Sequence, residues 1–442
     1  MIRQKLRRAS IQVRRHLLHN IVWRRRVAIG SGAVLLGLVA LAFAGLADTC
    51  GSLFNNVLAI SPWAALVVTP AGFALIALAM GRLGPAGKGS GIPQVIAAIP
   101  NPKGAAKELI SIRTAITKPI LTCGALLVGA SVGREGPTVQ VSAALMALIH
   151  RWLRVPLRGS VIIAGGAAGV AAAFNTPLAG VAFAIEELAS AYEQRMTLLV
   201  MSAVLLSGMV SLGLAGDYVY FGIMKETLPL TSVLLIAPVA GVLGGIGGGL
   251  FSRLLLNVTR ASGLPGRPWI RSNPVLWAAG CGLVVAIVGI ASGTSWGTGY
   301  DAARDLVEGG SISPWFGVAK FISTLATALS GIPGGIFAPS LATGAGFGSW
   351  LSALFPNDPA GAVVLLGMIA YFTGVVRAPL TAVVIITETT ASRGLILPLF
   401  TAAVIADGAA RLVCRERLYH GLAKGFGHGP PAPPAPADAS RG

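Results

Sequence analysis

The sequence predicts an all-α integral membrane protein built from two related halves, with several helices interrupted by glycine or proline. Of the 442 residues, 54% are hydrophobic and only 11% are charged. Glycine is abundant, at 58 residues, and it occurs within the apolar stretches. Similar motifs also recur 202 positions apart along the chain. A soluble domain needs more charge to hydrate its surface, so we expect lipid to surround most of this chain.

Six apolar stretches are long enough to cross a bilayer, which takes about 20 residues per helix. They are residues 27–47, 64–80, 197–215, 232–256, 274–292 and 394–413. Further apolar stretches are shorter and contain Gly or Pro. No strand-like alternation is long enough for an outer-membrane barrel. The many small residues instead favour closely packed helices.

The net charge of +18 is concentrated at the two ends of the chain. Nine Arg or Lys and no acidic residue fall within residues 1–26. A second basic group follows the last apolar stretch and comprises Arg411, Arg415, Arg417 and Lys424. Basic flanks at both ends predict that both termini are cytoplasmic. We therefore interpret residues 1–26 as a segment that anchors to lipid headgroups, and not as a nucleic-acid-binding segment or a cleavable signal peptide.

The remaining residue types argue against a metal site or an enzyme. Four cysteines stand far apart without metal-ligand spacing, which predicts neither a metal centre nor a disulfide framework. The five histidines lie near the ends or flanks of apolar stretches, and no aspartate cluster exists. An intramembrane hydrolase or transferase would need such groups at depth, so we expect no enzymatic activity and no cofactor. The tail at 425–442 is rich in Pro and Ala and predicts disorder, with no soluble regulatory domain.

An internal repeat relates two parts of the chain. Gly133–Pro137 and Gly335–Pro339 both read G-x-x-x-P, and forty residues after each proline a P-L-x-x-V segment leads to Glu186 or Glu388. Other pairs at the same offset are Lys118 with Lys320, and Ser90-Gly91 with Ser292-Gly293. We therefore divide the membrane part into repeats at 27–215 and 216–413. The residues alone leave open whether the repeats are parallel or inverted. Repeat-built transporters place their site where broken helices of both halves meet.

Three Gly/Pro-rich breaks interrupt apolar sequence, at 89–93 (GSGIP), 133–137 (GREGP) and 331–339 (GIPGGIFAP). Irregular backbone is too costly to face lipid, so such breaks must be enclosed by protein or a wet cavity. A helix that begins at this depth directs free N–H groups and a partial positive charge into the protein. Three such helix starts together would bind an anion and still release it. The alternative is that these glycines only permit close packing or kinks.

Five acidic residues lie in apolar surroundings and are candidates for function. They are Glu135, Glu186, Glu187, Glu388 and Asp407. Glu135 lies at a predicted helix start, where its carboxylate could occupy an anion site and leave on protonation; its alternative role is a simple helix cap. Glu187 aligns with Thr389 and so breaks the repeat, which favours a proton-relay role. Glu186 aligns with Glu388, which favours a structural role for both, and we expect Asp407 at a helix end or interface.

These segments resemble the CLC family of chloride channels and chloride/proton antiporters. The resemblance extends from about residue 27 to 425. GSGIP at 89–93, GREGP at 133–137 and GGIFAP at 334–339 read as the family's anion-binding signatures, and residues 172–188 and 376–388 also resemble family segments. The resemblance implies a CLC-type fold of two inverted-repeat halves with tilted and discontinuous helices. It also implies a homodimer with a separate pathway in each subunit and, for a prokaryotic member, residence in the bacterial inner membrane.

The resemblance further implies roles for individual residues. The Ser90 hydroxyl and the backbone N–H groups of Ile336 and Phe337 would bind the central chloride, and Tyr419, within the C-terminal segment 414–424, would close the inner end of the site. Glu135 would be the external gate, and Glu187 the internal proton-transfer group. The remaining chloride-binding candidates are Gly91, Arg134 and Gly136.

Three positions discriminate among branches of the family. Family channels generally lack an acid at the Glu187 position, so this glutamate favours exchange of chloride for protons over the alternative, a passive voltage- or pH-gated chloride channel. Fluoride-exporting relatives typically carry Met at the Ser90 position and lack the tyrosine, so Ser90 together with Tyr419 favours chloride. Gln94 and Ile96 stand where some prokaryotic relatives have acids, which leaves Lys118 without a predicted counter-charge.

Overall fold

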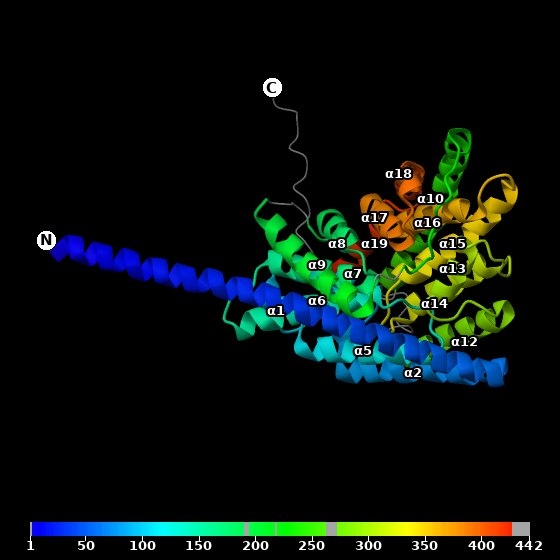
Figure 1. Cartoon of the computed structure of the whole chain (residues 1–442). Helices are drawn as coiled ribbons and strands as arrows, with labels where there is room; N and C mark the ends of the chain where they lie inside the picture. The colour runs from blue at the N-terminus through cyan, green and yellow to red at the C-terminus, as the bar shows by residue number, and fades with distance from the viewer. Residues whose placement is uncertain (1, 190–193, 217–218, 262–271, 427–442) are drawn as a thin grey trace, which may run out of the picture.

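The computed structural model of the protein describes residues 2–189, 194–216, 219–261 and 272–426 (Figure 1). The predicted disordered tail lies outside these residues from position 427 on, as do the side chains of residues 2–22. Within the described residues, the regular elements are helices, and a lone β-bridge joins Gly133 to Gly335. The predicted all-α class is thus confirmed.

Among the described residues, six helices are long and apolar enough to cross a membrane, and each overlaps one of the six predicted stretches. They lie within α1 (Ile2–Ile60), α2 (Ala65–Leu83), α9 (Gln194–Ala215), α10 (Leu230–Ala261), α12 (Pro274–Ser292) and α18 (Ile396–Val413). The first helix continues through residue 26 without a break, and Figure 1 shows its N-terminal part extending away from the other helices. These helices expose large apolar side chains such as Leu38, Leu205 and Leu397, as contact with lipid requires.

The shorter helices carry the predicted breaks, and some of them, such as α5 (Ile112–Leu127), also expose large apolar side chains. In the first half the shorter helices are α3 (Ile92–Ala98), α4 (Pro102–Ala105), α5, α6 (Glu135–Trp152), α7 (Gly159–Phe174) and α8 (Pro177–Phe183), followed by a π-helical turn at Ala184–Leu188. In the second half they are α13 (Tyr300–Val307), α14 (Phe316–Ser330), α15 (Phe337–Leu354), α16 (Ala360–Val376) and α17 (Pro379–Thr390), and α19 (Leu418–Ala423) follows α18.

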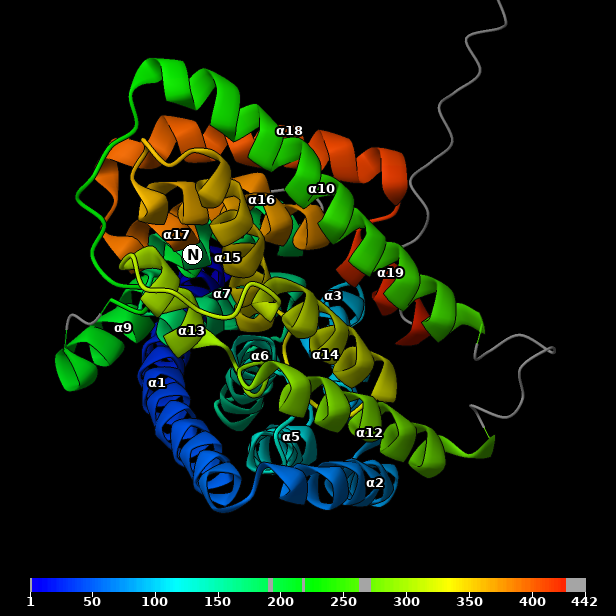
Figure 2. The ribbon, with the colours of Figure 1, turned by 90° about the vertical axis from the view of Figure 1, so that its right-hand side faces the viewer.

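Two equivalent helices, α7 and α16, form the centre of the core. Residues 161–174 of α7 and 361–376 of α16 are all buried, which suits sequences that are apolar all round. α6 packs against α7, and α15 packs against α16. Figure 2 shows α10 beside α18 along one edge of the molecule and α2 beside α12 along the opposite edge. The broken helices are thereby enclosed by spanning helices.

The two halves are related by an approximate two-fold axis, as the inverted repeat implied by the family resemblance requires. Gly133 and Gly335 exchange both backbone hydrogen bonds, each 2.7 Å, and only an antiparallel pair does so. Glu186 accepts N–H bonds at the start of α17, and Glu388 accepts N–H bonds at the start of α8. Equivalent residues thus make reciprocal contacts, as in an isologous interface. The predicted structural role of this glutamate pair is confirmed.

Lys118 and Lys320 are buried and equivalent, and each is held by backbone carbonyls. The Nζ of Lys118 donates to the carbonyls of Gly87 and Gly89, at 2.7 and 2.5 Å. The Nζ of Lys320 donates to three carbonyls, those of Ser295, Trp296 and Gly297. Carbonyl dipoles therefore replace the counter-charge that the sequence did not supply for Lys118.

These lysine contacts correct one predicted pairing in the repeat. The carbonyls of Ser295 and Gly297, which bind Lys320, correspond to those of Gly87 and Gly89, which bind Lys118, at an offset of 208 positions and not 202. Thr298-Gly299 is therefore the counterpart of Ser90-Gly91. Gly299 precedes α13 with φ 82°, as Gly91 precedes α3 with φ 106°. The predicted match with Ser292-Gly293 is wrong because the connection from α3 to α5 is longer and contains α4, whereas α13 leads directly to α14.

Candidate anion-binding site

The starts of α3, α6 and α15 meet at one place inside the protein. Gly133 and Gly335 join the residues before α6 and α15, and the Gly334 N–H donates to the Gly89 carbonyl, 3.1 Å away. A Cβ placed on Gly136, in the first turn of α6, would lie 2.8 Å from the Ser90 carbonyl oxygen. The three breaks, which are far apart in sequence, therefore converge as expected.

Glycine and proline explain locally why the helices begin here. Gly91 adopts φ 106°, and a Cβ on it would lie 2.8 Å from the Gly136 carbonyl oxygen, so the position requires glycine on both counts. Pro93, Pro137 and Pro339 each lie in the first turn of their helix. A proline there loses no intrahelical hydrogen bond, because the first N–H groups of a helix have no partner within it.

A cavity of about 520 Å³ opens beside these helix starts. Its lining includes Ser90, Ile336 and Tyr419, together with the exposed Lys88. The Ser90 Oγ and the Tyr419 hydroxyl are buried and face each other, and neither makes a hydrogen bond of regular geometry in the described part of the chain. Buried polar groups are normally satisfied, so two facing hydroxyls without a regular hydrogen bond beside helix N-termini indicate a place for a hydrogen-bond acceptor such as an anion.

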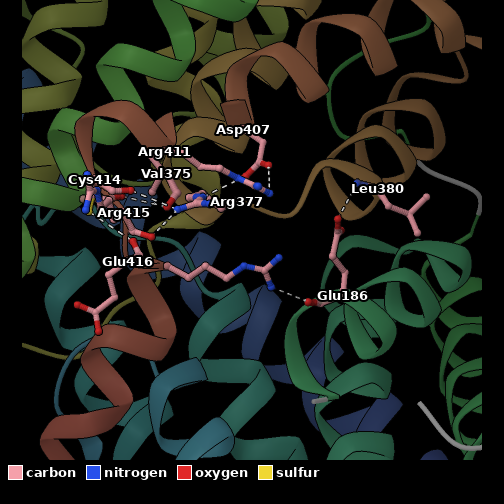
Figure 3. A network of polar contacts seen from close by, with 11 residues as sticks. Glu186, Val375, Arg377, Leu380, Asp407, Arg411, Cys414, Arg415 and Glu416 are labelled. Atoms are coloured by element: carbon pink, nitrogen blue, oxygen red, sulfur yellow. Dashed lines mark hydrogen bonds and ion pairs between the residues drawn. The ribbon is translucent and has the colours of Figure 1, made fainter. Parts of the chain in front are cut away.

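A polar network before α19 positions Tyr419 (Figure 3). Arg377 ends α16 in the left-handed conformation, with φ 63°. Its Nε donates to Asp407 Oδ1 of α18, at 3.0 Å, and its Nη1 donates to the carbonyls of Cys414 and Arg415. The network joins α16 and α18 to the segment that leads into α19. Asp407 thus lies at an interface between helices, in agreement with its expected place.

Phe337 contributes an apolar wall with its side chain and a helix start with its backbone. Its ring is fully buried and packs against the rings of Phe174, Phe183, Phe372 and Tyr419, with centroids 5.0 to 6.1 Å apart. Ile336 is the N-cap residue of α15. The first N–H groups of a helix have no intrahelical acceptor, so the backbone here is suited to an anion, whereas the side chains exclude water.

Glu135 is the first residue of α6 and is fully buried. Its Oε1 accepts a hydrogen bond from the Tyr300 hydroxyl, and its Oε2 has no hydrogen-bond partner among the described residues. Tyr300 begins α13, the repeat counterpart of α3. Sequence reasoning missed this tyrosine. An alignment of the repeat at offset 208 would have placed it at an equivalent helix start, opposite Ile92.

Arg134 precedes Glu135, but its side chain points away from the cavity. Nη1 donates to the Ala44 carbonyl and to Asp48 Oδ1, at 2.8 and 2.7 Å, and Nη2 donates to the Tyr220 hydroxyl at 2.9 Å. The guanidinium also lies over the rings of Tyr220 and Tyr300. Arg134 therefore fixes the α6 start to α1, and only its backbone remains beside the predicted chloride-binding residues Gly91 and Gly136.

Glu186 and Glu187 point in different directions from the π-helical turn. The Glu186 carboxylate caps α17, whereas the Glu187 carboxylate is fully buried. His420 Nδ1 lies 3.3 Å from Glu187 Oε1, and neither atom has a hydrogen bond of regular geometry. His420 follows Tyr419 on α19 and was predicted only as a flanking residue. No hydrogen bond joins Glu187 to Glu135 in the described structure, so these two acids occupy separate places.

Curated relatives share most of the chain. It is 29% identical over 411 residues to the H(+)/Cl(-) exchange transporter ClcA of Citrobacter koseri, covering 87% of this chain and 84% of the relative. It is 31% identical over 356 residues to the ClcA exchange transporter of Cronobacter sakazakii, covering 76% of this chain and 74% of the relative.

Solved structures share the fold. A slow cyanobacterial Cl⁻/H⁺ antiporter superposes with a TM-score of 0.77 at 24% identity, covering 91% of this chain and 98% of the other. A CLC-type fluoride/proton antiporter gives 0.74 at 22% identity, covering 88% and 95%. The family model described as voltage gated chloride channel matches residues 72–411. The chain therefore belongs to the CLC family, and it is a multi-pass membrane protein of anion transport rather than an enzyme.

Proposed function

We propose that this protein exchanges chloride for protons across a bacterial inner membrane, through an anion site gated by Glu135. The observation that carries the proposal is the cavity at the meeting helix starts, whose lining includes two buried, facing hydroxyls, those of Ser90 and Tyr419, without a regular hydrogen bond. The names of the ClcA relatives, H(+)/Cl(-) exchange transporters, support the same substrate pair.

The site suits an anion that must be released again. The buried cations Arg134 and Lys118 are held by other protein groups, so neither offers a free full charge to the cavity. Partial charges at the helix starts and hydroxyl donors remain, and these bind chloride without trapping it. The exposed Lys88 in the cavity lining raises the local concentration of anions.

Glu135 and Glu187 account for coupling to protons. Glu135 carries a negative charge at the α6 start, the same kind of place that favours chloride, so carboxylate and chloride compete for it. Protonation removes that charge and frees the glutamate to move. Glu187 is a second buried carboxylate, on the π-helical turn beside α19 rather than at the α6 start. Two acids in separate places permit proton passage that does not follow the whole chloride route.

The proposal includes an assembly and a topology. We propose a homodimer with a separate pathway in each subunit and with both termini in the cytoplasm, consistent with the basic segment 1–26. Residues 27–215 and 216–413 form the two repeats of each pathway, and residues 414–424 bring Tyr419 to its inner end.

The test uses purified protein in lipid vesicles under a pH gradient. Exchange predicts a reversal potential that shifts with the pH gradient, whereas a passive channel would stay at the chloride equilibrium potential. Glu135→Gln should stop proton movement while chloride still passes, and Glu226→Gln, an exposed glutamate, is the control that leaves both fluxes unchanged. A wild-type reversal potential that does not change with the pH gradient would refute exchange. Replacing chloride by fluoride in the same assay tests selectivity, and preferred fluoride transport would overturn the chloride assignment.

A further inference from the structure

Glu187 lacks direct contact with water. Its carboxylate is fully buried, and neither oxygen has a hydrogen-bond partner of regular geometry in the described structure. If Glu187 passes protons, as proposed above, a group between it and the solvent must carry them. A buried carboxylate in an apolar membrane protein does not exchange protons with bulk water unless such a group or a water path exists.

His420 is placed to be that group. Its Nδ1 is buried and lies 3.3 Å from Glu187 Oε1, whereas 33% of its side chain is exposed. The ring therefore spans the boundary between the protein interior and the solvent. Tyr419 and Leu422 of the same helix line the anion cavity, but His420 does not. The path through His420 to Glu187 is thus separate from the anion cavity.

Besides His420, the titratable groups near Glu187 are Glu186, Arg417 and Tyr419, and the buried Tyr419 lines the anion cavity. The neighbouring helices α3, α7 and α8 contain no titratable residue. Glu186 is directed to the start of α17. Arg417 donates to the Glu186 backbone carbonyl at 3.1 Å, and arginine does not release its proton. Histidine is the side chain whose ordinary pKa lies closest to neutrality, which suits reversible transfer.

We propose that His420 transfers protons between the cytoplasmic solution and Glu187; this inference rests on the proposed exchange function. The protonated ring gives its Nδ1 proton to the Glu187 carboxylate, leaving a neutral imidazole with its proton on Nε2 and a neutral carboxylic acid. A turn of the ring about the Cβ–Cγ bond exposes the bare Nδ1 to water, where it takes up the next proton. The reverse sequence carries protons outward from Glu187.

The test measures proton and chloride fluxes of vesicles that contain wild-type protein, His420→Gln, Glu187→Gln and the control Lys424→Gln. Lys424 lies next to α19 and is exposed. Removing a proton-transfer group costs roughly 10²-fold or more, so His420→Gln should lower proton flux at least tenfold. Lys424→Gln should match the wild type.

A second variant separates proton transfer from structure. His420→Ala should lose proton flux and recover it when imidazole is added on the cytoplasmic side, which a merely structural histidine would not allow. The inference is overturned if His420→Gln keeps the wild-type proton flux, or if imidazole does not restore the flux of His420→Ala. In either case the proposed exchange still stands if Glu187→Gln stops the proton flux. Absence of proton flux in the wild type would instead overturn the proposed function itself.

Discussion

Replacing Gly136 by alanine should weaken chloride binding because the added methyl group meets Ser90. The Cβ would lie 2.8 Å from the Ser90 carbonyl oxygen and would also overlap its Oγ, whereas ordinary contacts begin at 3.4 Å. Overpacking of this kind typically costs about 1–3 kcal/mol, and relieving it requires both the hydroxyl and the backbone carbonyl of Ser90 to shift from their places at the cavity. The chloride affinity should therefore fall roughly 5- to 150-fold. Ala338 occupies the equivalent position of α15, so alanine itself is compatible with this helix turn.

The measurement is calorimetric titration of chloride into purified protein in chloride-free detergent solution. Gly280→Ala in α12 is the matched control, because nothing lies within 4 Å of its added Cβ. This control should keep the wild-type affinity and gain up to about 1 kcal/mol of helix stability. Wild-type chloride affinity in Gly136→Ala would refute the placement of Ser90 at the anion site.

Two further predictions concern the cavity lining and the repeat. Lys88→Gln should slow chloride uptake several-fold at low ionic strength but not at high salt, because salt screens a surface charge. Lys103→Gln is the control in the same flux assay. Equal uptake by the two variants at low ionic strength would contradict the prediction. Glu388→Gln should cost roughly 1.5–3 kcal/mol, because an amide cannot accept both N–H bonds that Leu178 and Ala179 donate at 3.2 and 2.9 Å. A lower thermal unfolding midpoint in detergent is expected, and an unchanged midpoint would show that this cap is dispensable.

The sequence by itself determined the environment of the chain and the places where helices break. Lipid-facing helices are recognised by their length and apolar composition, so the six spans found in the described residues were predictable. Glycine and proline act locally on the backbone, so the breaks before α3, α6 and α15 were predictable as well. The reciprocal glutamates Glu186 and Glu388 followed from the repeat, because residues at equal positions in two related halves make equal contacts.

Only the tertiary structure decided where the side chains point. Arg134 lies within a break that carries an anion-binding signature, yet its guanidinium bonds to Asp48, which lies 86 residues earlier on α1. Tyr300 contacts Glu135 across 165 residues, and His420 contacts Glu187 from α19, near the end of the described residues. Such partners come from segments whose packing depends on the whole fold, and no local pattern encodes them. The 202-position offset also failed at Ser90-Gly91, because one longer connection in the first half shifts the register there without changing the helices on either side.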